Sequence, residues 1–247
     1  MWSFLHKLAS PPYFYRMAGR WLPWLVWLTG LAFTAGLYLG LGVAPPDYQQ
    51  GESYRIMFIH VPAAWMSLFI YMLMAFWSVI HLVWNIKLAE ILMYRSATIG
   101  AAFTFLALAT GSLWGKPMWG AWWVWDARLT SELILLFLYL GYMALVAAIE
   151  DPRTAARAGG LLILVGVVNI PVIHYSVEWW NTLHQGPTVT KLDKPSIHIS
   201  MLIPLLVMAL ACKLYYLTLL LLRARNELLV REKRSAWVRE LVSNDFR

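Results

Sequence analysis

The sequence is poor in charge and contains a single cysteine. Only 13% of its 247 residues are Asp, Glu, Lys or Arg, whereas soluble domains carry about 25% charged residues. Cys212 lies in an apolar segment and has no second cysteine with which to form an internal disulfide or a CxxC site. With 60% hydrophobic residues, this composition favours a membrane protein over a soluble protein with an unusually apolar core.

Motifs of the common enzyme and nucleic-acid-binding classes are also missing. The sequence has no nucleophile elbow, phosphate loop or metalloprotease motif, and no residue set suggests acid–base turnover. Most of the charge that makes up the net +7 lies at the two ends of the chain and in short loops, which is typical of membrane topology signals. We therefore expect a binding protein of the membrane and not an enzyme.

Long stretches of the chain are free, or nearly free, of charge. A helix needs about 20 mostly apolar residues to cross the hydrocarbon core. Six stretches meet this requirement: 21–42, 56–86, 96–115, 129–149, 158–177 and 195–222. Because every backbone polar group in lipid must be bonded internally, we predict an all-α integral membrane protein with six transmembrane helices in one membrane domain, 1–247. The first stretch is long enough to be a retained helix rather than a signal peptide.

Lysine and arginine predict the orientation. With six spans, both ends of the chain lie on one side of the membrane, and that side would hold fifteen of the twenty Lys and Arg residues when Lys213 is counted with the basic tail 223–247. Since cytoplasmic segments carry this excess, both termini are predicted to be cytoplasmic. The outer face then receives the loops 43–55, 114–128 and 178–194.

The second outer loop concentrates tryptophan. Aromatic belts at membrane interfaces need one or two anchors per helix end, but this loop holds five tryptophans: Trp114, Trp119, Trp122, Trp123 and Trp125. If the stretch from Trp119 is helical, Trp119, Trp122 and Trp123 share one face. That face would lie flat on the membrane or against a flat ligand, and each aromatic stack would contribute about 0.5–1.5 kcal/mol.

Two histidines flank the tryptophan loop. His60 opens the second span two residues before Pro62, which suits a first helical turn, and His184 lies in an irregular "NTLHQGP" segment. A lone histidine at a membrane boundary is usually a structural polar residue. Two histidines on different outer loops beside aromatic rings favour a role as ligands instead. His174 is expected to be buried in its helix and to be a weaker candidate for a ligand.

Charged residues close to the tryptophans narrow the ligand. Arg55, Lys116 and Arg128 could clamp carboxylates or could only mark the interface, and Asp126 could pair with Arg128 or cap the next helix. Glu132 either reaches the surface or lines an outer cavity. Heme is a flat, apolar ligand that carries carboxylates, and its iron is bound by imidazole in many proteins. These residues together therefore favour heme as the ligand.

Three motifs carry a family resemblance. "WGKPMWGAWWVWDARLTSE", residues 114–132, resembles the tryptophan-rich WWD signature of heme-handling proteins in cytochrome c maturation. "SYRIMFIHVPAAW", residues 53–65, and "IHYSVEWWNTLHQGP", residues 173–187, resemble the heme exporter protein C (CcmC) branch of that family. Six spans and the short chain also resemble this branch.

The resemblance implies a function. Heme b would lie against the tryptophan loop on the periplasmic side of the bacterial inner membrane, with His60 and His184 as the axial ligands of its iron. The expected partners are the ATPase and membrane subunits of an ABC transporter, a small single-helix subunit and a periplasmic heme chaperone that receives the heme. The expected heme contacts are Trp114, Trp119, Trp122, Trp123, Trp125, Asp126, Arg55 and Arg128.

Two alternatives remain from the residues alone. A small-solute transporter would need charges or broken helices near the middle of the membrane, and only Asn169 and Pro171 suggest such a break. A b-type electron carrier would need paired histidines at both depths of the bundle, and His81 is the one candidate near the cytoplasmic side.

Overall fold

The protein is a bundle of long helices. The computed structural model describes residues 10–186, 189 and 194–245. Six helical segments there are long and apolar enough to cross a membrane: Pro11–Val43, Glu52–Trp84, Lys87–Trp119, Ala127–Ala148, Pro152–Trp179 and Ile199–Arg231. Apart from one isolated bridge between Asp47 and Gly51, the described residues form no β structure, so the prediction of an all-α, six-span membrane protein is confirmed.

The helices follow one another with short connections. In chain order they are α2 (Pro11–Leu37) with the π-helix η1 (Tyr38–Val43), the 3₁₀ helix η2 (Glu52–Ile56) with α3 (Met57–Trp84), α4 (Lys87–Trp119), α5 (Ala127–Ala148), α6 (Pro152–Gly166), α7 (Asn169–Trp179), α8 (Ile199–Arg231) and the short α9 (Ala236–Asp245). The first part of the predicted tail 223–247 is therefore the end of α8.

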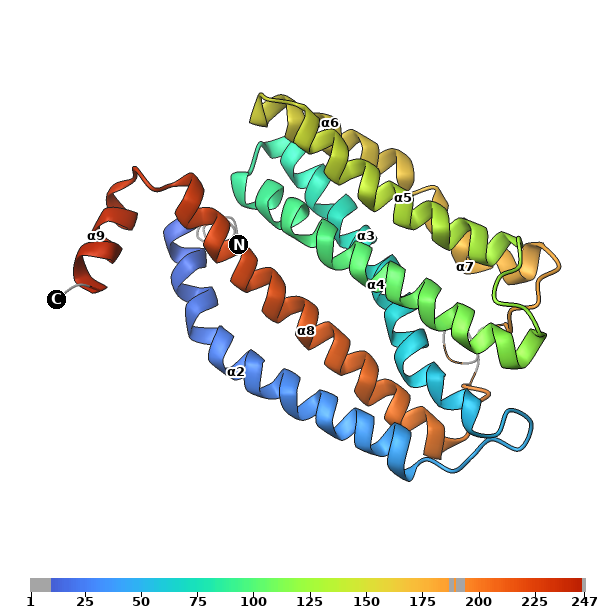
Figure 1. Cartoon of the computed structure of the whole chain (residues 1–247). Helices are drawn as coiled ribbons and strands as arrows, with labels where there is room; N and C mark the ends of the chain where they lie inside the picture. The colour runs from blue at the N-terminus through green and yellow to red at the C-terminus, as the bar shows by residue number, and fades with distance from the viewer. Residues whose placement is uncertain (1–9, 187–188, 190–193, 246–247) are drawn as a thin grey trace.

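The helices form three groups, with the α3–α4 pair between the other two (Figure 1). α2 packs along α8, α3 packs along α4, and α5, α6 and α7 cover the other side. Buried tyrosines join the groups: the rings of Tyr71 and Tyr139 meet edge to face with centroids 5.2 Å apart. Gly100 makes this contact possible, because a Cβ at that position would lie 2.3 Å from the Tyr139 ring.

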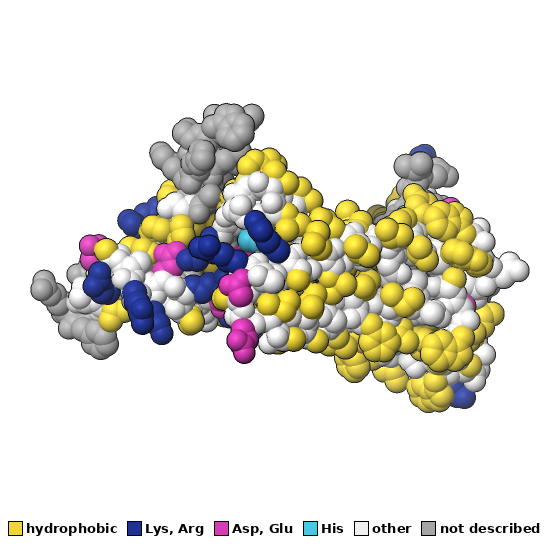
Figure 2. Space-filling model, turned by 90° about the horizontal axis from the view of Figure 1, so that it is seen from above, with side chains coloured by type: hydrophobic (Ala, Val, Ile, Leu, Met, Phe, Trp, Pro, Cys, Tyr) yellow, Lys and Arg dark blue, Asp and Glu magenta, His cyan; other side chains and the backbone are white. Residues whose placement is uncertain are grey.

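The two ends of the bundle differ in charge. Lys and Arg side chains gather at the end where α2 begins and α8 finishes, while hydrophobic side chains cover the length of the helices (Figure 2). At this basic end, Arg231 pairs with both Glu90 and Glu227, and Lys87 pairs with Glu232 at 2.8 Å. We call the opposite end, where His60 lies, the histidine end.

Helix α4 differs from the sequence-based expectation, whereas the break that Asn169 and Pro171 suggested in the fifth span is present. α4 continues through Gly115 and Pro117 to Trp119, and Gly120, at φ +75°, ends it, so only residues 120–126 of the predicted loop 114–128 are irregular. The fifth span is interrupted between α6 and α7. The Asn169 side-chain amide donates a hydrogen bond of 2.9 Å to the Ser131 carbonyl and ties this break to α5.

Candidate functional site

His60 is held in one tautomer by its neighbours on α4. Its Nδ1 lies 3.0 Å from the Ala107 carbonyl oxygen and 3.1 Å from the Thr110 hydroxyl. The Thr110 hydroxyl donates its hydrogen to Leu106 and a carbonyl can only accept, so Nδ1 carries the proton. The Nε2 lone pair is left free, which is the state in which imidazole ligates a metal.

His184 also carries its proton on Nδ1, although it lies in a different part of the chain. It lies in the irregular segment after α7, and its Nδ1 is 2.9 Å from the Gln185 carbonyl oxygen. Partial burial lowers the pKa of His184, and the positive charge of Arg128 lowers it further. A lowered pKa keeps the imidazole neutral near pH 7, so its Nε2 is also available as a ligand.

The two rings lie close together. Their centroids are 6.3 Å apart and their planes differ by 39°. Metal–imidazole bonds are about 2.0–2.1 Å, and an imidazole nitrogen lies about 1.1 Å from its ring centre, so two axial imidazoles on one metal would have centres about 6 Å apart. Chain segments distant in sequence therefore bring two neutral imidazoles to the spacing of a bis-imidazole site.

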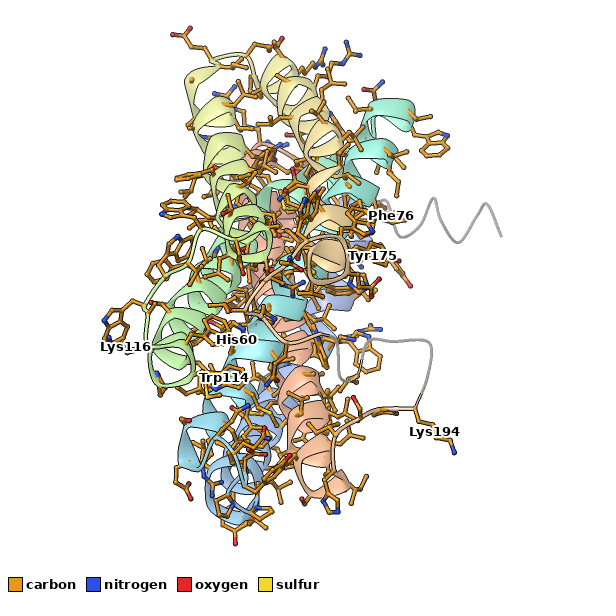
Figure 3. The ribbon with its side chains drawn as sticks, turned by 90° about the vertical axis from the view of Figure 1, so that its right-hand side faces the viewer. His60, Phe76, Trp114, Lys116, Tyr175 and Lys194 are labelled. Carbon is orange, nitrogen blue, oxygen red and sulfur yellow. The ribbon has the colours of Figure 1, made fainter. Side chains whose placement is uncertain are left out.

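Both rings line a narrow cavity of about 80 Å³, which we call the slot. Its lining combines three aromatic rings, two imidazoles and two charged groups: Trp114, Trp119, Trp123, His60, His184, Arg128 and Glu132, with Gln50, Met118 and smaller residues between them. The Trp114 ring meets His60 edge to face at 5.7 Å (Figure 3), and Trp119 lies 6.3 Å from His184. The slot is therefore apolar, with its polar groups concentrated at a few points.

The five tryptophans divide into two sets. Trp114, Trp119 and Trp123 line the slot, whereas Trp122 and Trp125 are 54% and 76% exposed. The condition under which Trp119, Trp122 and Trp123 would share one helical face is not met, because α4 ends at Trp119. The irregular backbone after Gly120 sends Trp122 and Trp123 in different directions.

Of the three basic residues named from the sequence, one lines the slot and two do not. Arg128 lines the slot, and its Nη1 donates to the Ile173 carbonyl at 2.5 Å. Arg55 is bonded to Glu52 and to the Gly40 carbonyl, at 2.8 Å for the latter, and it does not line the slot. Lys116 donates to the Gly120 carbonyl at 3.0 Å and stabilises the turn that ends α4.

Asp126 supports the site without lining it. One carboxylate oxygen caps α5 by accepting from the Leu129 amide at 2.8 Å, which is one of the two roles expected from the sequence. The other oxygen accepts from the Thr182 hydroxyl, and Thr182 in turn accepts from the His184 amide at 3.1 Å. Asp126 therefore connects α5 to the segment that carries His184.

Several lining residues lie outside the set predicted to contact heme, among them Glu132 and Gln50. Glu132 is buried and accepts a 2.6 Å hydrogen bond from the Ser67 hydroxyl. It follows Arg128 by four residues, so helical spacing alone places both on one face. Gln50 accepts from the Trp114 indole N–H at 3.0 Å, and no pattern in the sequence singles it out.

The other histidines are elsewhere. His174 is half-buried and lines a larger neighbouring cavity, His198 caps the start of α8 by accepting from the Ser200 amide at 3.3 Å, and His81 is buried near the other end of α3. His6 lies outside the described residues. Among the described histidines, only His60 and His184 line the slot.

Comparison with known proteins gives consistent matches along the chain. The family model described as heme exporter protein C matches residues 4–239. The heme exporter protein C of Escherichia coli strain K12 is 54% identical over 242 residues, covering 98% of each chain. That of Bradyrhizobium diazoefficiens is 54% identical over 231 residues, covering 94% of this chain and 88% of the relative. A putative cytochrome c biosynthesis ccmC-like mitochondrial protein of Marchantia polymorpha is 47% identical over 198 residues, covering 80% and 84%.

Proposed function

The chain belongs to the heme exporter protein C family, and from this premise we propose that it binds heme b between His60 and His184 and presents it to a periplasmic heme chaperone during c-type cytochrome biogenesis. The observation that carries the proposal is the pair of imidazoles. Both protonated Nδ1 atoms are engaged by backbone carbonyls, and the ring centres are 6.3 Å apart. Heme here is a cargo that is bound and released, so we assign no catalytic residue.

The lining of the slot suits a flat, apolar dicarboxylate. Trp114, Trp119 and Trp123 offer aromatic contact area, and Arg128 supplies a guanidinium that can pair with a propionate. We propose that Trp122, Trp125, Asp126 and Arg55 act outside the slot, as loop surface and as supports of the neighbouring segments.

The slot must widen to admit the ligand. Its volume of about 80 Å³ is below the roughly 300–1,000 Å³ of ordinary ligand pockets. His60 is fixed on α3, whereas His184 is on irregular backbone, so His184 is the ligand that can move. We propose that heme first binds near His60 and that His184 closes on the second face of the iron.

Family membership and the charge distribution support a proposed location and a set of partners. Under the positive-inside rule the basic end of the bundle would be cytoplasmic, and we propose that the histidine end, with its tryptophan loop, faces the periplasm from the inner membrane. An ABC transporter's ATPase and membrane subunits, a single-helix subunit and the chaperone are the proposed partners. His81 has no second histidine beside it among the described residues, so a two-heme electron-transfer role has no support at the basic end.

The test is the absorption spectrum of the purified protein. We expect the wild type to bind heme with a bis-imidazole, low-spin spectrum. His60→Ala and His184→Ala should each lose this spectrum, because each removes one axial ligand. His198→Ala is the matched control, since His198 only caps α8, and it should leave the spectrum unchanged.

Two results would contradict the proposal. One is a wild-type protein that neither carries heme nor takes up added heme. The other is a low-spin spectrum that survives both alanine substitutions, which would place the ligands elsewhere.

A further inference from the structure

A second, larger cavity opens beside the slot. It has a volume of about 600 Å³ and is lined by residues from α3, α7 and α8, including Trp65, Phe69, His174, Leu206, Ala209 and Lys213; we call it the lateral groove. It shares Gln50, Trp114, Arg128 and Gln185 with the slot. The two spaces are therefore adjacent, with Arg128 exposed to both.

Lys213, which the sequence analysis counted with the basic tail, lies instead inside the sixth span and places a positive charge in this groove. It follows the first residue of α8, Ile199, by fourteen positions, which is about 21 Å along a helix in a hydrocarbon core about 30 Å thick. Its Nζ lies 5.5 Å from the centre of the Phe69 ring. Within the described residues, no acidic group forms an ion pair with it.

Such a lysine is unfavourable in a membrane protein. A charged group within a span opposes insertion into the bilayer, and charges there usually mark a pathway or a binding site. A lysine that only reached for the membrane surface would extend along its helix towards a membrane–water boundary. The Lys213 ammonium group lies beside Phe69. Phe69 is nine residues, or about 14 Å, along α3 from His60, so the charge stays within the span.

We propose that the lateral groove is a second binding site, which receives heme from the lipid before it reaches the slot, and that Lys213 pairs there with a propionate. The inference rests on the proposed function and adds the path by which heme reaches the slot. The groove supplies what the slot does not: enough volume for a flat macrocycle, aromatic walls from Trp65 and Phe69, and a cation at membrane depth. Arg128, at the shared wall, can take over a propionate as the iron approaches His60.

The experiment measures the rate of heme transfer. Full-length, heme-free protein is reconstituted in phosphatidylcholine vesicles, heme-loaded vesicles are added, and the appearance of the bis-imidazole spectrum is followed in time. We expect Lys213→Gln to slow this transfer roughly tenfold, the factor for one lost charge-assisted contact, while the final spectrum remains that of the wild type. Ala209→Trp, which fills the groove, should slow the transfer as well.

Matched variants distinguish a specific effect at the lateral groove from a general loss of folding. Lys213→Arg keeps the charge and should restore most of the rate. Leu210→Trp adds the same side chain at the next position on α8, which is exposed and outside the groove, and should transfer heme at the wild-type rate. Wild-type rates in both Lys213→Gln and Ala209→Trp would overturn the inference.

Two further arms identify the group that Lys213 binds. With heme dimethyl ester, which has no carboxylates, wild type and Lys213→Gln should react at the same rate; a persisting difference would overturn the pairing with a propionate. An effect of Lys213→Gln that appears only in phosphatidylglycerol vesicles would assign Lys213 to a lipid head group and also overturn it. Failure of the proposed function would look different from failure of this inference, because the wild type itself would then give no spectrum that depends on His60 and His184.

Discussion

At the scale of single residues, the chemistry of the site depends on which ring nitrogen carries a proton. The carbonyls of Ala107 and Gln185 hold protons on the Nδ1 atoms of His60 and His184. Both Nε2 atoms can therefore ligate without first losing a proton. Arg128 contributes a second effect, because its charge lowers the pKa of His184.

This pKa shift predicts how heme binding depends on pH. A histidine has an ordinary pKa of about 6.5, and that of His184 is lowered, first by burial and then by Arg128. Heme affinity should therefore stay constant as pH falls to about 6.5 and decline only below it, when protonation of His184 begins to compete with the iron. The measurement is a heme titration across a pH series.

Arg128→Gln provides the comparison for this prediction. Removing the nearby positive charge should raise the pKa of His184, so the decline should begin at a higher pH than in the wild type. An identical pH profile in the variant would show that Arg128 does not influence His184 electrostatically.

At the scale of structural elements, the segment that carries His184 is held by a short chain of hydrogen bonds. Asp126, at the start of α5, accepts from Thr182, which accepts from the His184 amide. The aspartate at the end of the tryptophan motif is therefore a positioning residue. Under the proposed function it would act on His184 and not on the heme directly.

Thr182→Val tests this link. Valine keeps the shape of threonine and removes the hydroxyl, so His184 should ligate less firmly and heme affinity should fall about fivefold, for the loss of about 1 kcal/mol. A high-spin component should appear in the spectrum. Thr154→Val is the matched control, because Thr154 donates to the helix-capping Asp151 at 2.6 Å without contacting the site, and it should leave the spectrum unchanged.

Helix packing makes a second prediction at this scale. Gly100→Ala places a methyl group where the Tyr139 ring now lies, and overpacking of this kind costs about 1–3 kcal/mol. The variant should unfold at a lower temperature in detergent than the wild type. Gly141→Ala, whose Cβ would meet nothing within 4 Å, should be neutral or slightly stabilising; equal loss in both variants would exclude the packing explanation.

At the scale of the whole molecule, positive charge is concentrated at one end of the bundle (Figure 2). The ion pairs of Arg231 with Glu90 and Glu227 join α8 to α4 at the basic end. The histidine end carries the slot, the lateral groove and the exposed Trp122 and Trp125. An uneven distribution of this kind orients the protein in a membrane.

Orientation can be measured with single cysteines. The native Cys212 is buried and can be replaced by serine. A membrane-impermeant thiol reagent added outside spheroplasts should then label Trp125→Cys, at the histidine end, and should reach Arg234→Cys only after the membrane is opened. The reverse pattern would invert the proposed topology.

The sequence by itself determined the membrane fold and the residue types of the site. A charge-free run of about twenty residues has only one stable form in lipid, the helix, so all six spans could be predicted from composition. The motifs around His60, His184 and the tryptophan loop singled out the two imidazoles that the fold brings together. That these bind heme stays a prediction for the spectrum to test.

Only the tertiary structure decided how these parts are arranged. The division of the tryptophans depends on α4 ending at Gly120, whereas the sequence predicted that the loop would begin at Trp114. The link from Asp126 to His184 and the groove around Lys213 join segments distant in sequence. Local patterns do not contain such contacts, because these depend on how long helices pack and on which faces remain uncovered.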